Sequence, residues 1–232
     1  MFDLEPLTEK CKHVLSEADH VCIGISPFNS YFSTRRIAAL AGWAMARFGS
    51  CHFFVPDAAA VYTLQALGYP AERARHKAAR QGAYVHNKVA TALTSLGVAR
   101  PEDLVWGARR LAECPRYQEL HDHARRLFDT HDDFRDACLD ASRWVLDRKL
   151  PNGREPTGEQ LLLAVRYFLA ELPMFTDSAA ICLGSPGHSS LFVYHQRVRF
   201  LERFYRRELA WHPVEQQGFL VVTENPLVEQ PV

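Results

Sequence analysis

Residues 21–55 hold the pattern that most limits the fold of this chain. Two short apolar runs, 21–25 (VCIGI) and 51–55 (CHFFV), are typical of buried strands. Between them, Ser33 is a suitable helix N-cap and Gly49 a suitable terminator. Apolar side chains recur at helical spacing in this interval: Ile37, Leu40, Ala41, Ala44 and Phe48. Such a strand–helix–strand unit pairs two parallel strands, so we predict an α/β fold with an open parallel sheet flanked by helices.

The rest of the chain continues this alternation. Further helices are predicted over 58–67, 71–96, 115–128, 132–146 and 159–171. The last of these should end before Pro173, because a proline disfavours helical backbone in the residue before it. Further strands are predicted over 104–106, 179–184, 191–195 and 218–223, with an exposed loop over 152–158. No repeat or low-complexity tract divides the chain, so we expect a single domain over 1–232.

Composition excludes several classes of protein. Lys and Arg number 27 and Asp and Glu number 27, so any nucleic-acid binding needs a local basic patch. No apolar run approaches the ~20 residues of a membrane-spanning helix, and the acidic segment 1–10 does not resemble a signal peptide. The six cysteines form no CxxC pair, which argues against a zinc ribbon or a redox pair. We therefore expect reduced thiols in a cytoplasmic protein with no membrane partner.

A basic stripe marks the predicted helix 71–96. Four cations and a tyrosine share one helix face: Arg73, Lys77, Arg80, Tyr84 and Lys88. Within 71–93 the acid Glu72 stands against five Lys or Arg residues. A stripe of one sign with an aromatic side chain suits a phosphate backbone, so we predict a polyanion-binding surface. An ordinary solvated face is the alternative, although such faces usually mix charges of both signs.

The loop after the first strand is a candidate catalytic site. Ligands of open α/β sheets bind beyond the carboxyl ends of the strands, and Ser26 lies there. Gly24 allows close approach of a substrate to the backbone, Ser26 is a candidate nucleophile, and Asn29 a candidate donor to an oxyanion. The alternative is that Ser26 and Asn29 simply stabilise a turn. A hydrolase elbow (GxSxG) would require glycine where Phe28 stands.

Two further places carry candidate chemistry. Tyr167 and Glu171 lie four residues apart on the predicted helix 159–171, so they share a face. A glutamate on this apolar helix is either buried with a raised pKa or exposed in the last turn. Tyr194 and His195 follow the strand at 191–193, where a tyrosine suits a proton relay or an ordinary interfacial position.

Neither a cofactor nor a metal is predicted. The chain has no GxGxxG and no GxxxxGK[ST] motif, so no cradle for NAD or ATP is visible. The histidines His121, His123 and His131 stand near acidic residues, but positions 121 and 123 fall on different faces of a helix. Single histidines on charged helices are usually solvated, and we therefore expect no metal site.

Taken together, these motifs resemble those of the cyclodipeptide synthases over about residues 14–223. The segments that carry the resemblance are 24–26 with 29–33, 167–171 followed by Pro173, and 189–190 leading into 194–195. Asn29 with Tyr194 is similar to the subgroup that has an Asn in this loop and a Tyr after the late strand. Arg197 departs from the pattern, because some relatives have an acidic residue there, and the basic stripe is thinner than in strongly basic relatives.

This resemblance implies a Rossmann-like fold similar to the catalytic domain of class I tyrosyl- and tryptophanyl-tRNA synthetases. It implies two aminoacyl-tRNA substrates, a cyclic dipeptide (2,5-diketopiperazine) as product and no cofactor. It also implies a ping-pong mechanism in which Ser26 carries first an aminoacyl and then a dipeptidyl group. Tyr167 and Glu171 would hold the amino group of the first aminoacyl moiety.

The same resemblance assigns the remaining site residues. Tyr194 would position substrate and relay protons with His195 beside it, while Asn29 and the backbone near Gly24 would stabilise the oxyanion. The basic stripe would bind tRNA through four cations: Arg73, Lys77, Arg80 and Lys88. The alternatives are a serine hydrolase or acyltransferase acting on a small ester, and a non-catalytic tRNA-binding protein. A monomer is the favoured oligomeric state.

Alignment by these motifs also implies two side-chain pockets. The first draws on Cys22, Gly24, Phe54, Ala108, Met174 and Phe192. That apolar and aromatic set suits Phe, Leu or a neutral His. The second draws on Ala141, Trp144, Arg148, Gln196, Arg197 and Arg199. Three arginines favour an acidic or polar side chain, with Glu the leading prediction, unless they point outward to tRNA phosphates.

Overall fold

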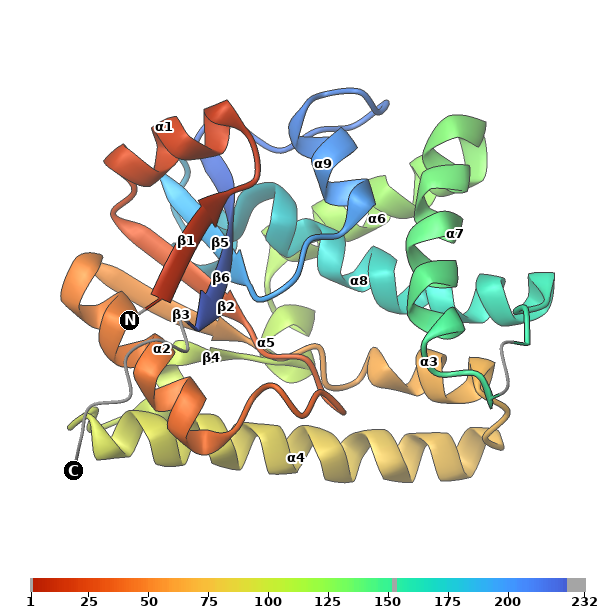
Figure 1. The fold of residues 1–232 in the computed structure, drawn as a ribbon, viewed down its shortest axis with the longest axis horizontal. Helices are drawn as coiled ribbons and strands as arrows, with labels where there is room; N and C mark the ends of the chain where they lie inside the picture. Colours follow the sequence, from red (N-terminus) through yellow and green to blue (C-terminus); the bar gives the residue numbers. More distant parts are fainter. Residues whose placement is uncertain (1, 152–153, 225–232) are drawn as a thin grey trace.

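The computed structural model describes residues 2–151 and 154–224 (Figure 1). Among them, six strands form one sheet in the order β1-β6-β5-β2-β3-β4. The strands are β1 (Phe2–Pro6), β2 (His20–Gly24), β3 (Ser50–Phe54), β4 (Val105–Trp106), β5 (Ser190–Tyr194) and β6 (Gln217–Glu224). Strands β2 to β6 pair in parallel and β1 pairs with β6 in antiparallel fashion. The predicted α/β fold with a parallel sheet is confirmed.

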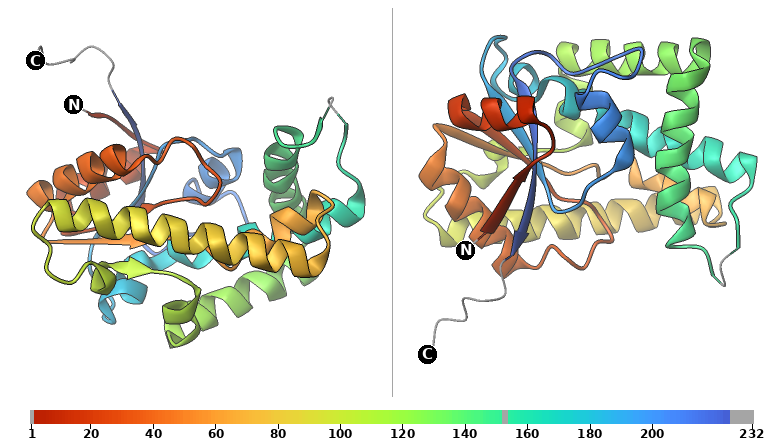
Figure 2. Two further views of the ribbon diagram at one scale, coloured as in Figure 1. Left: turned by 90° about the horizontal axis from the view of Figure 1, so that it is seen from below. Right: turned by 45° about the horizontal axis from the view of Figure 1, so that its top comes forward.

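Helices cover both faces of this sheet. They are α1 (Glu9–Glu17), α2 (Thr34–Arg47), α3 (Ala60–Ala66), α4 (Ala71–Ser95), α5 (Ala108–Ala112), α6 (Pro115–Thr130), α7 (Asp132–Asp147), α8 (Gly158–Leu183) and α9 (Arg199–Tyr205). Side chains alternate along β2, so Val21 and Ile23 pack with α2 and α4, whereas Cys22 packs in the core that includes α6 and α8. Figure 2 shows α4 lying along one side of the molecule.

The first strand–helix–strand unit forms as the sequence predicts. Strands β2 and β3 pair in parallel, and Ser33 Oγ accepts a hydrogen bond of 3.2 Å from the Arg36 N–H at the start of α2. The adjacent strands β2 and β5 are also parallel, so their carboxyl ends meet at the same edge. This edge carries the loop with Ser26 on one side and Tyr194 on the other.

Helix α8 corrects two predictions. It continues through Pro173 to Leu183, so the predicted end before Pro173 and the predicted strand over 179–184 are wrong. Residues 172–182 are buried, and a short buried apolar run does not distinguish a strand from a helix. The backbone departs from helical geometry at Asp177 (φ −159°, ψ 63°), whose carboxylate accepts hydrogen bonds from Arg116, at 2.8 Å from Nη2. Helix α8 is therefore interrupted at Asp177 without ending there, and the hydrogen bonds from Arg116 stabilise this point.

Strand β1 was not predicted, although its half-buried apolar residues alternate with the exposed acids Asp3 and Glu5, the pattern of a half-buried strand. The predicted loop over 152–158 is described only in part: residues 152–153 lie outside the described residues, and α8 already begins at Gly158, after the cap formed by Thr157.

All six cysteines belong to the described residues, and they are free thiols. No helix in the described ranges is long and apolar enough to cross a membrane.

Candidate active site

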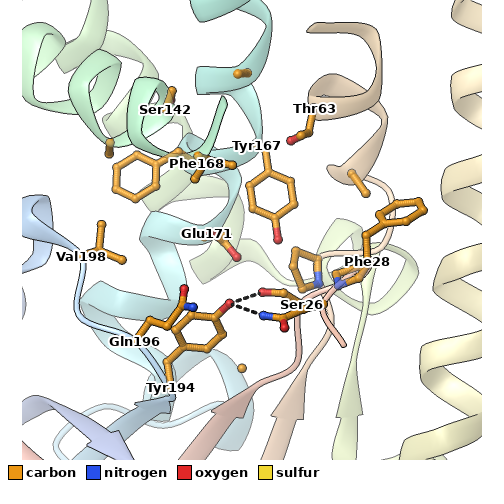
Figure 3. A pocket seen from close by; sticks show the side chains of 18 of the residues that line it. Ser26, Phe28, Thr63, Ser142, Tyr167, Phe168, Glu171, Tyr194, Gln196 and Val198 are labelled. Carbon is orange, nitrogen blue, oxygen red and sulfur yellow. Dashed lines mark hydrogen bonds between the residues drawn. The ribbon is translucent and has the colours of Figure 1, made fainter. Parts of the chain in front are cut away.

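A cavity of about 560 Å³ opens at the carboxyl ends of β2, β3 and β5. Its walls come from the loop after β2, from α3, α7 and α8, and from the segment after β5 (Figure 3). Ser26, Asn29, Tyr167, Glu171 and Tyr194 all line it. The fold therefore brings together residues that stand up to 168 positions apart in the sequence. This is the position in which open α/β folds bind their ligands.

Ser26 faces Tyr194 across the junction of two neighbouring strands. The Ser26 Oγ lies 2.8 Å from the Tyr194 hydroxyl, within hydrogen-bond distance (Figure 3). The loop reaches this geometry with Phe28 in the left-handed region (φ 60°), which a bulky residue rarely adopts. Burial raises the pKa of Tyr194 to about 12, although the hydrogen bond with Ser26 opposes this rise. Tyr194 is therefore a neutral phenol at neutral pH, able to donate or accept a hydrogen bond.

A hydrogen-bond network fixes the orientation of Asn29. Its Oδ1 accepts from the Tyr31 N–H at 3.0 Å, so its Nδ2 faces His195 Nε2 at 2.8 Å. Because Nδ2 donates, His195 Nε2 is an acceptor, in agreement with burial that lowers the pKa of His195 to about 4. The second N–H group of Nδ2 points to the Tyr194 hydroxyl at 3.4 Å. The imidazole of His195 stacks on Tyr31, with ring centroids 3.9 Å apart. Both donors of Asn29 are thus directed at neighbouring side chains.

Tyr167 and Glu171 project from one face of α8 toward Ser26 (Figure 3). Each is half-buried and faces the cavity. Burial raises the pKa of Glu171 to about 8, and the hydrogen bond with Tyr167 limits the rise. Burial also raises the pKa of Tyr167, and the neighbouring Glu171 carboxylate raises it further. The sequence left open whether Glu171 is buried with a raised pKa or exposed in the last turn of its helix. The first interpretation applies, because α8 continues past Glu171.

The residues predicted for the first pocket fall into two groups. Gly24, Phe54 and Phe192 line the cavity. Cys22 and Met174 do not, because both are fully buried in the core. Ala108 also lies outside the lining, at the start of α5, where its N–H donates to the Asp57 carboxylate at 2.9 Å.

Three phenylalanines take the place of these residues in the cavity wall: Phe168, Phe175 and Phe219. Phe168 and Phe175 stand seven residues apart on α8, a spacing that places them on the same helix face. This signal was hidden because the predicted helix ended at residue 171. The wall of the cavity that contains Phe54 and Phe192 is therefore largely aromatic.

The predicted second pocket loses two of its three arginines. Ala141, Trp144, Arg148 and Gln196 line the cavity, and Arg197 and Arg199 do not. Arg197 instead forms ion pairs with Glu5 at 2.8 Å and Glu202 at 3.2 Å. Arg199 is exposed at the start of α9.

Arg148 remains in this part of the cavity. Its guanidinium carbon lies 3.5 Å from the centroid of the Trp144 ring, a stacked cation–π contact. Lys149 also lines the cavity and was not predicted. This wall of the cavity therefore carries two cations, Arg148 and Lys149, instead of the three arginines that the sequence suggested.

The basic stripe on α4 divides into three parts. Arg73, Arg80 and Tyr84 are exposed, as an interaction surface requires. Lys77 lines the cavity and donates to the Tyr69 hydroxyl at 2.7 Å. Lys88 donates to the Phe32 carbonyl at 3.1 Å, so it braces the end of the Ser26 loop and is half-buried. The exposed cations Arg73 and Arg80 therefore lie on α4 on either side of Lys77, which lines the cavity. Lys88 contacts the loop that carries Ser26 instead.

The histidines considered for metal binding do not gather at a site. His121 stacks on Tyr117 with ring centroids 5.8 Å apart, and His123 meets the ring of Trp211 at 5.1 Å. These contacts are those of aromatic packing.

Comparison with known proteins places this arrangement in one family. The family model described as cyclodipeptide synthase matches residues 2–224. The cyclo(L-tyrosyl-L-tyrosyl) synthase of Mycobacterium tuberculosis is 34% identical over 225 residues, covering 97% of this chain and 76% of that protein. The cyclo(L-leucyl-L-leucyl) synthase of Bacillus subtilis is 32% identical over 231 residues, covering 96% of this chain and 90% of that protein.

Solved structures agree. A cyclodipeptide synthetase from Mycobacterium tuberculosis superposes with a TM-score of 0.84 at 32% identity, covering 97% of this chain and 94% of that one. The tyrosyl-tRNA synthetase of Archaeoglobus fulgidus shares the fold, with a TM-score of 0.53 at 15% identity and coverage of 94% of this chain and 59% of that one. The likeness to class I tRNA synthetases is thus confirmed for the fold. The chain belongs to the cyclodipeptide synthase family, whose members are enzymes that form cyclic dipeptides.

Proposed function

We propose that this chain joins the aminoacyl groups of two aminoacyl-tRNAs into a 2,5-diketopiperazine through an ester on Ser26. The observation that carries the proposal is the position of Ser26 Oγ, 2.8 Å from the Tyr194 hydroxyl inside a cavity that Tyr167 and Glu171 also line. A family member from Candidatus Glomeribacter gigasporarum, with a TM-score of 0.52 at 11% identity, was solved bound to Phe-tRNAPhe. That structure supports aminoacyl-tRNA as the substrate class.

In the first step, Ser26 Oγ attacks the carbonyl carbon of an aminoacyl-tRNA ester. The bond between Oγ and this carbon forms, the bond to the ribose oxygen of the tRNA breaks, and the serine proton passes to that oxygen. The Tyr194 hydroxyl is placed to accept the serine proton while donating its own, since it lies 2.8 Å away. Its raised pKa makes it a relay for the proton rather than a resident base.

Glu171 and Tyr167 hold the amino group of this first aminoacyl moiety. A carboxyl with a pKa of about 8 is mostly protonated in the empty cavity at neutral pH. An incoming ammonium stabilises the carboxylate, so binding releases a proton and creates a charge-assisted hydrogen bond. The pair thereby favours an α-amino group over a neutral group of the same size.

In the second step, the amine of the second aminoacyl-tRNA attacks the Ser26 ester, which forms the peptide bond and releases Ser26 Oγ. Ser26 Oγ then attacks the ester of the resulting dipeptidyl-tRNA, and the dipeptidyl group moves onto Ser26 as the tRNA hydroxyl leaves with the serine proton. The free amine of the dipeptide then attacks the ester carbonyl, the ring closes and Ser26 Oγ regains its proton. Asn29 serves as a positioning residue for Tyr194, because its two Nδ2 hydrogens face His195 and Tyr194. We assign this role to Asn29 in place of oxyanion stabilisation.

The two regions of the cavity suggest the residues that are joined. The aromatic wall of Phe54, Phe192 and Phe175 suits an apolar or flat first side chain. The region near Trp144 and Arg148 suits a polar or acidic second side chain, with Glu the leading candidate. The exposed cations Arg73 and Arg80 would contact tRNA phosphates.

A product screen tests this function. Wild-type protein and Ser26→Ala would be incubated with pooled aminoacylated tRNA, and small products identified by mass spectrometry. We expect diketopiperazines from the wild type and none from the folded Ala variant. Release of free amino acids without cyclic products would indicate a hydrolase instead. Exclusively apolar products would refute the acidic second residue and leave the reaction class intact.

A further inference from the structure

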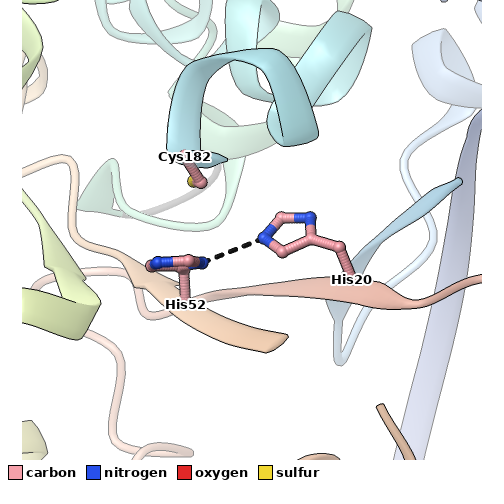
Figure 4. Close-up of side chains that lie close together, drawn as sticks. All are labelled: His20, His52 and Cys182. Atoms are coloured by element: carbon pink, nitrogen blue, oxygen red, sulfur yellow. Dashed lines mark hydrogen bonds between the residues drawn. The ribbon is translucent and has the colours of Figure 1, made fainter. Parts of the chain in front are cut away.

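A second cluster of reactive side chains lies outside the cavity. His20 begins β2, whose other end leads to Ser26, His52 lies on β3, and Cys182 is near the end of α8 (Figure 4). The potential ligand atoms of these three residues all lie within 4.8 Å of one another. All three are buried, with 0%, 8% and 7% of their surface exposed. None of them takes part in the reaction proposed above.

Hydrogen bonds fix which nitrogen of His20 carries the proton. Gln217 Oε1 accepts from the Ser178 N–H at 2.8 Å and from the Ser178 hydroxyl at 2.9 Å, while Gln217 Nε2 donates to the Gly218 carbonyl. Since the one hydroxyl proton of Ser178 is used there, Ser178 Oγ accepts from Ser190, 2.7 Å away. Ser190 has then used its own proton, so its Oγ accepts from His20 Nδ1 at 2.7 Å.

It follows that His20 presents a lone pair on Nε2. This atom lies 3.0 Å from His52 Nδ1, and without a metal it accepts the proton of that nitrogen. Two nitrogens bound to one zinc ion at ~2.0–2.1 Å lie about 3.3 Å apart in tetrahedral geometry. The spacing of the two imidazoles is therefore close to that of a ligand pair. A metal-binding histidine is commonly oriented by a hydrogen bond from its other ring nitrogen to an oxygen acceptor, and the Ser190 hydroxyl supplies such an acceptor to His20 Nδ1.

We propose that His20, His52 and Cys182 form a zinc-binding site that ties α8 to strands β2 and β3. On binding, the proton of His52 moves from Nδ1 to Nε2, which frees Nδ1 as a ligand, and the Cys182 thiol loses its proton to solvent. Two imidazoles and a thiolate are ligands that Zn²⁺ prefers. Water fills the fourth position.

The site would have a mechanical consequence for the enzyme. Helix α8 carries Tyr167 and Glu171, and β2 leads into the loop that carries Ser26. A metal ion bound between the end of α8 and the start of β2 would fix the position of these two elements relative to each other, at the end of β2 opposite the cavity. The cluster could not be predicted from the sequence, because positions 20, 52 and 182 are far apart and form no spaced motif.

The test uses Co²⁺ as a spectroscopic substitute for Zn²⁺ on the full chain after dialysis against a chelator. We expect one Co²⁺ per chain with a thiolate-to-cobalt charge-transfer band, displacement of Co²⁺ by Zn²⁺, and a melting temperature that rises with free Zn²⁺. Cys182→Ala should abolish the band, whereas Cys138→Ala, a matched change at a buried cysteine on α7, should retain it. Absence of the band in the wild type, or its survival in Cys182→Ala, would overturn the proposal.

A second variant keeps the test independent of the folding of Cys182→Ala. Ser190→Ala leaves all three ligands in place but removes the acceptor that orients His20. We expect the band to persist with metal affinity about 10–100-fold weaker. Unchanged affinity would show that the hydrogen-bond chain does not prepare His20 for a metal, and this would contradict the argument from the tautomer.

Discussion

Replacement of Glu171 by glutamine should stabilise the protein increasingly as the pH rises. The carboxyl has a pKa of about 8 in the folded state against a reference value of 4.5. Between these values the folded chain holds a proton that the unfolded chain has lost, so the stability of the wild type falls with rising pH in this window. Applied to this interval, the linkage relation gives a loss of about 3 kcal/mol between pH 5 and pH 8. Glutamine preserves the shape and cannot ionise, so the variant avoids this loss.

Urea unfolding of both proteins at several pH values measures this effect. The difference in the free energy of unfolding between Glu171→Gln and the wild type should grow by about 3 kcal/mol from pH 5 to pH 8. Glu159→Gln is the matched control, since Glu159 is an exposed carboxyl on the first turn of the same helix. A difference that stays constant with pH would show that Glu171 is ionised in the empty cavity, and the proton release proposed for substrate binding would fail with it.

Three further outcomes are expected from the geometry. Tyr194→Phe removes the hydroxyl 2.8 Å from the serine, and kcat/KM for cyclodipeptide formation should fall by about 10²–10⁴-fold in a folded protein. Gly24→Ala places a Cβ 2.8 Å from the Phe192 Cζ, so the ring must move toward the cavity, and the product mixture should shift to a smaller first residue. Arg73→Glu with Arg80→Glu should lower the rate at subsaturating tRNA and make it less dependent on salt, and an unchanged salt dependence would remove these residues from the tRNA surface.

The parts of the fold that depend on strong local patterns were predictable from the sequence. The apolar runs of β2 and β3 and the spacing of apolar residues in α2 are unambiguous, because each strand is buried on both faces and α2 buries one stripe. The half-exposed strand β1 carries only a five-residue alternation of apolar and acidic residues. Helix α8 was divided in error because local proline rules favoured an end at Pro173, whereas packing on both sides maintains the helix.

The site residues that follow the ends of strands were predictable from the sequence. The direction of a long side chain was not, because packing against distant residues determines it. Ser26 and Tyr194 stand at the ends of neighbouring parallel strands, so topology alone brings them together. By contrast, whether Arg197 points into the cavity depends on Glu5, which lies on a strand that was not predicted. The fate of such a long side chain is set by a partner distant in sequence, and spacing carries no information on it.

In the proposed mechanism, Ser26 carries the aminoacyl group during turnover. This role of Ser26 is tested most directly by rapid acid quenching of the wild type with aminoacylated tRNA, followed by mass analysis of the intact protein and of its peptides. We expect an added aminoacyl mass in ester linkage on the peptide that contains Ser26, formed before the cyclic product and absent from Ser26→Ala. Product formation by Ser26→Ala, or an adduct confined to another residue, would contradict this role.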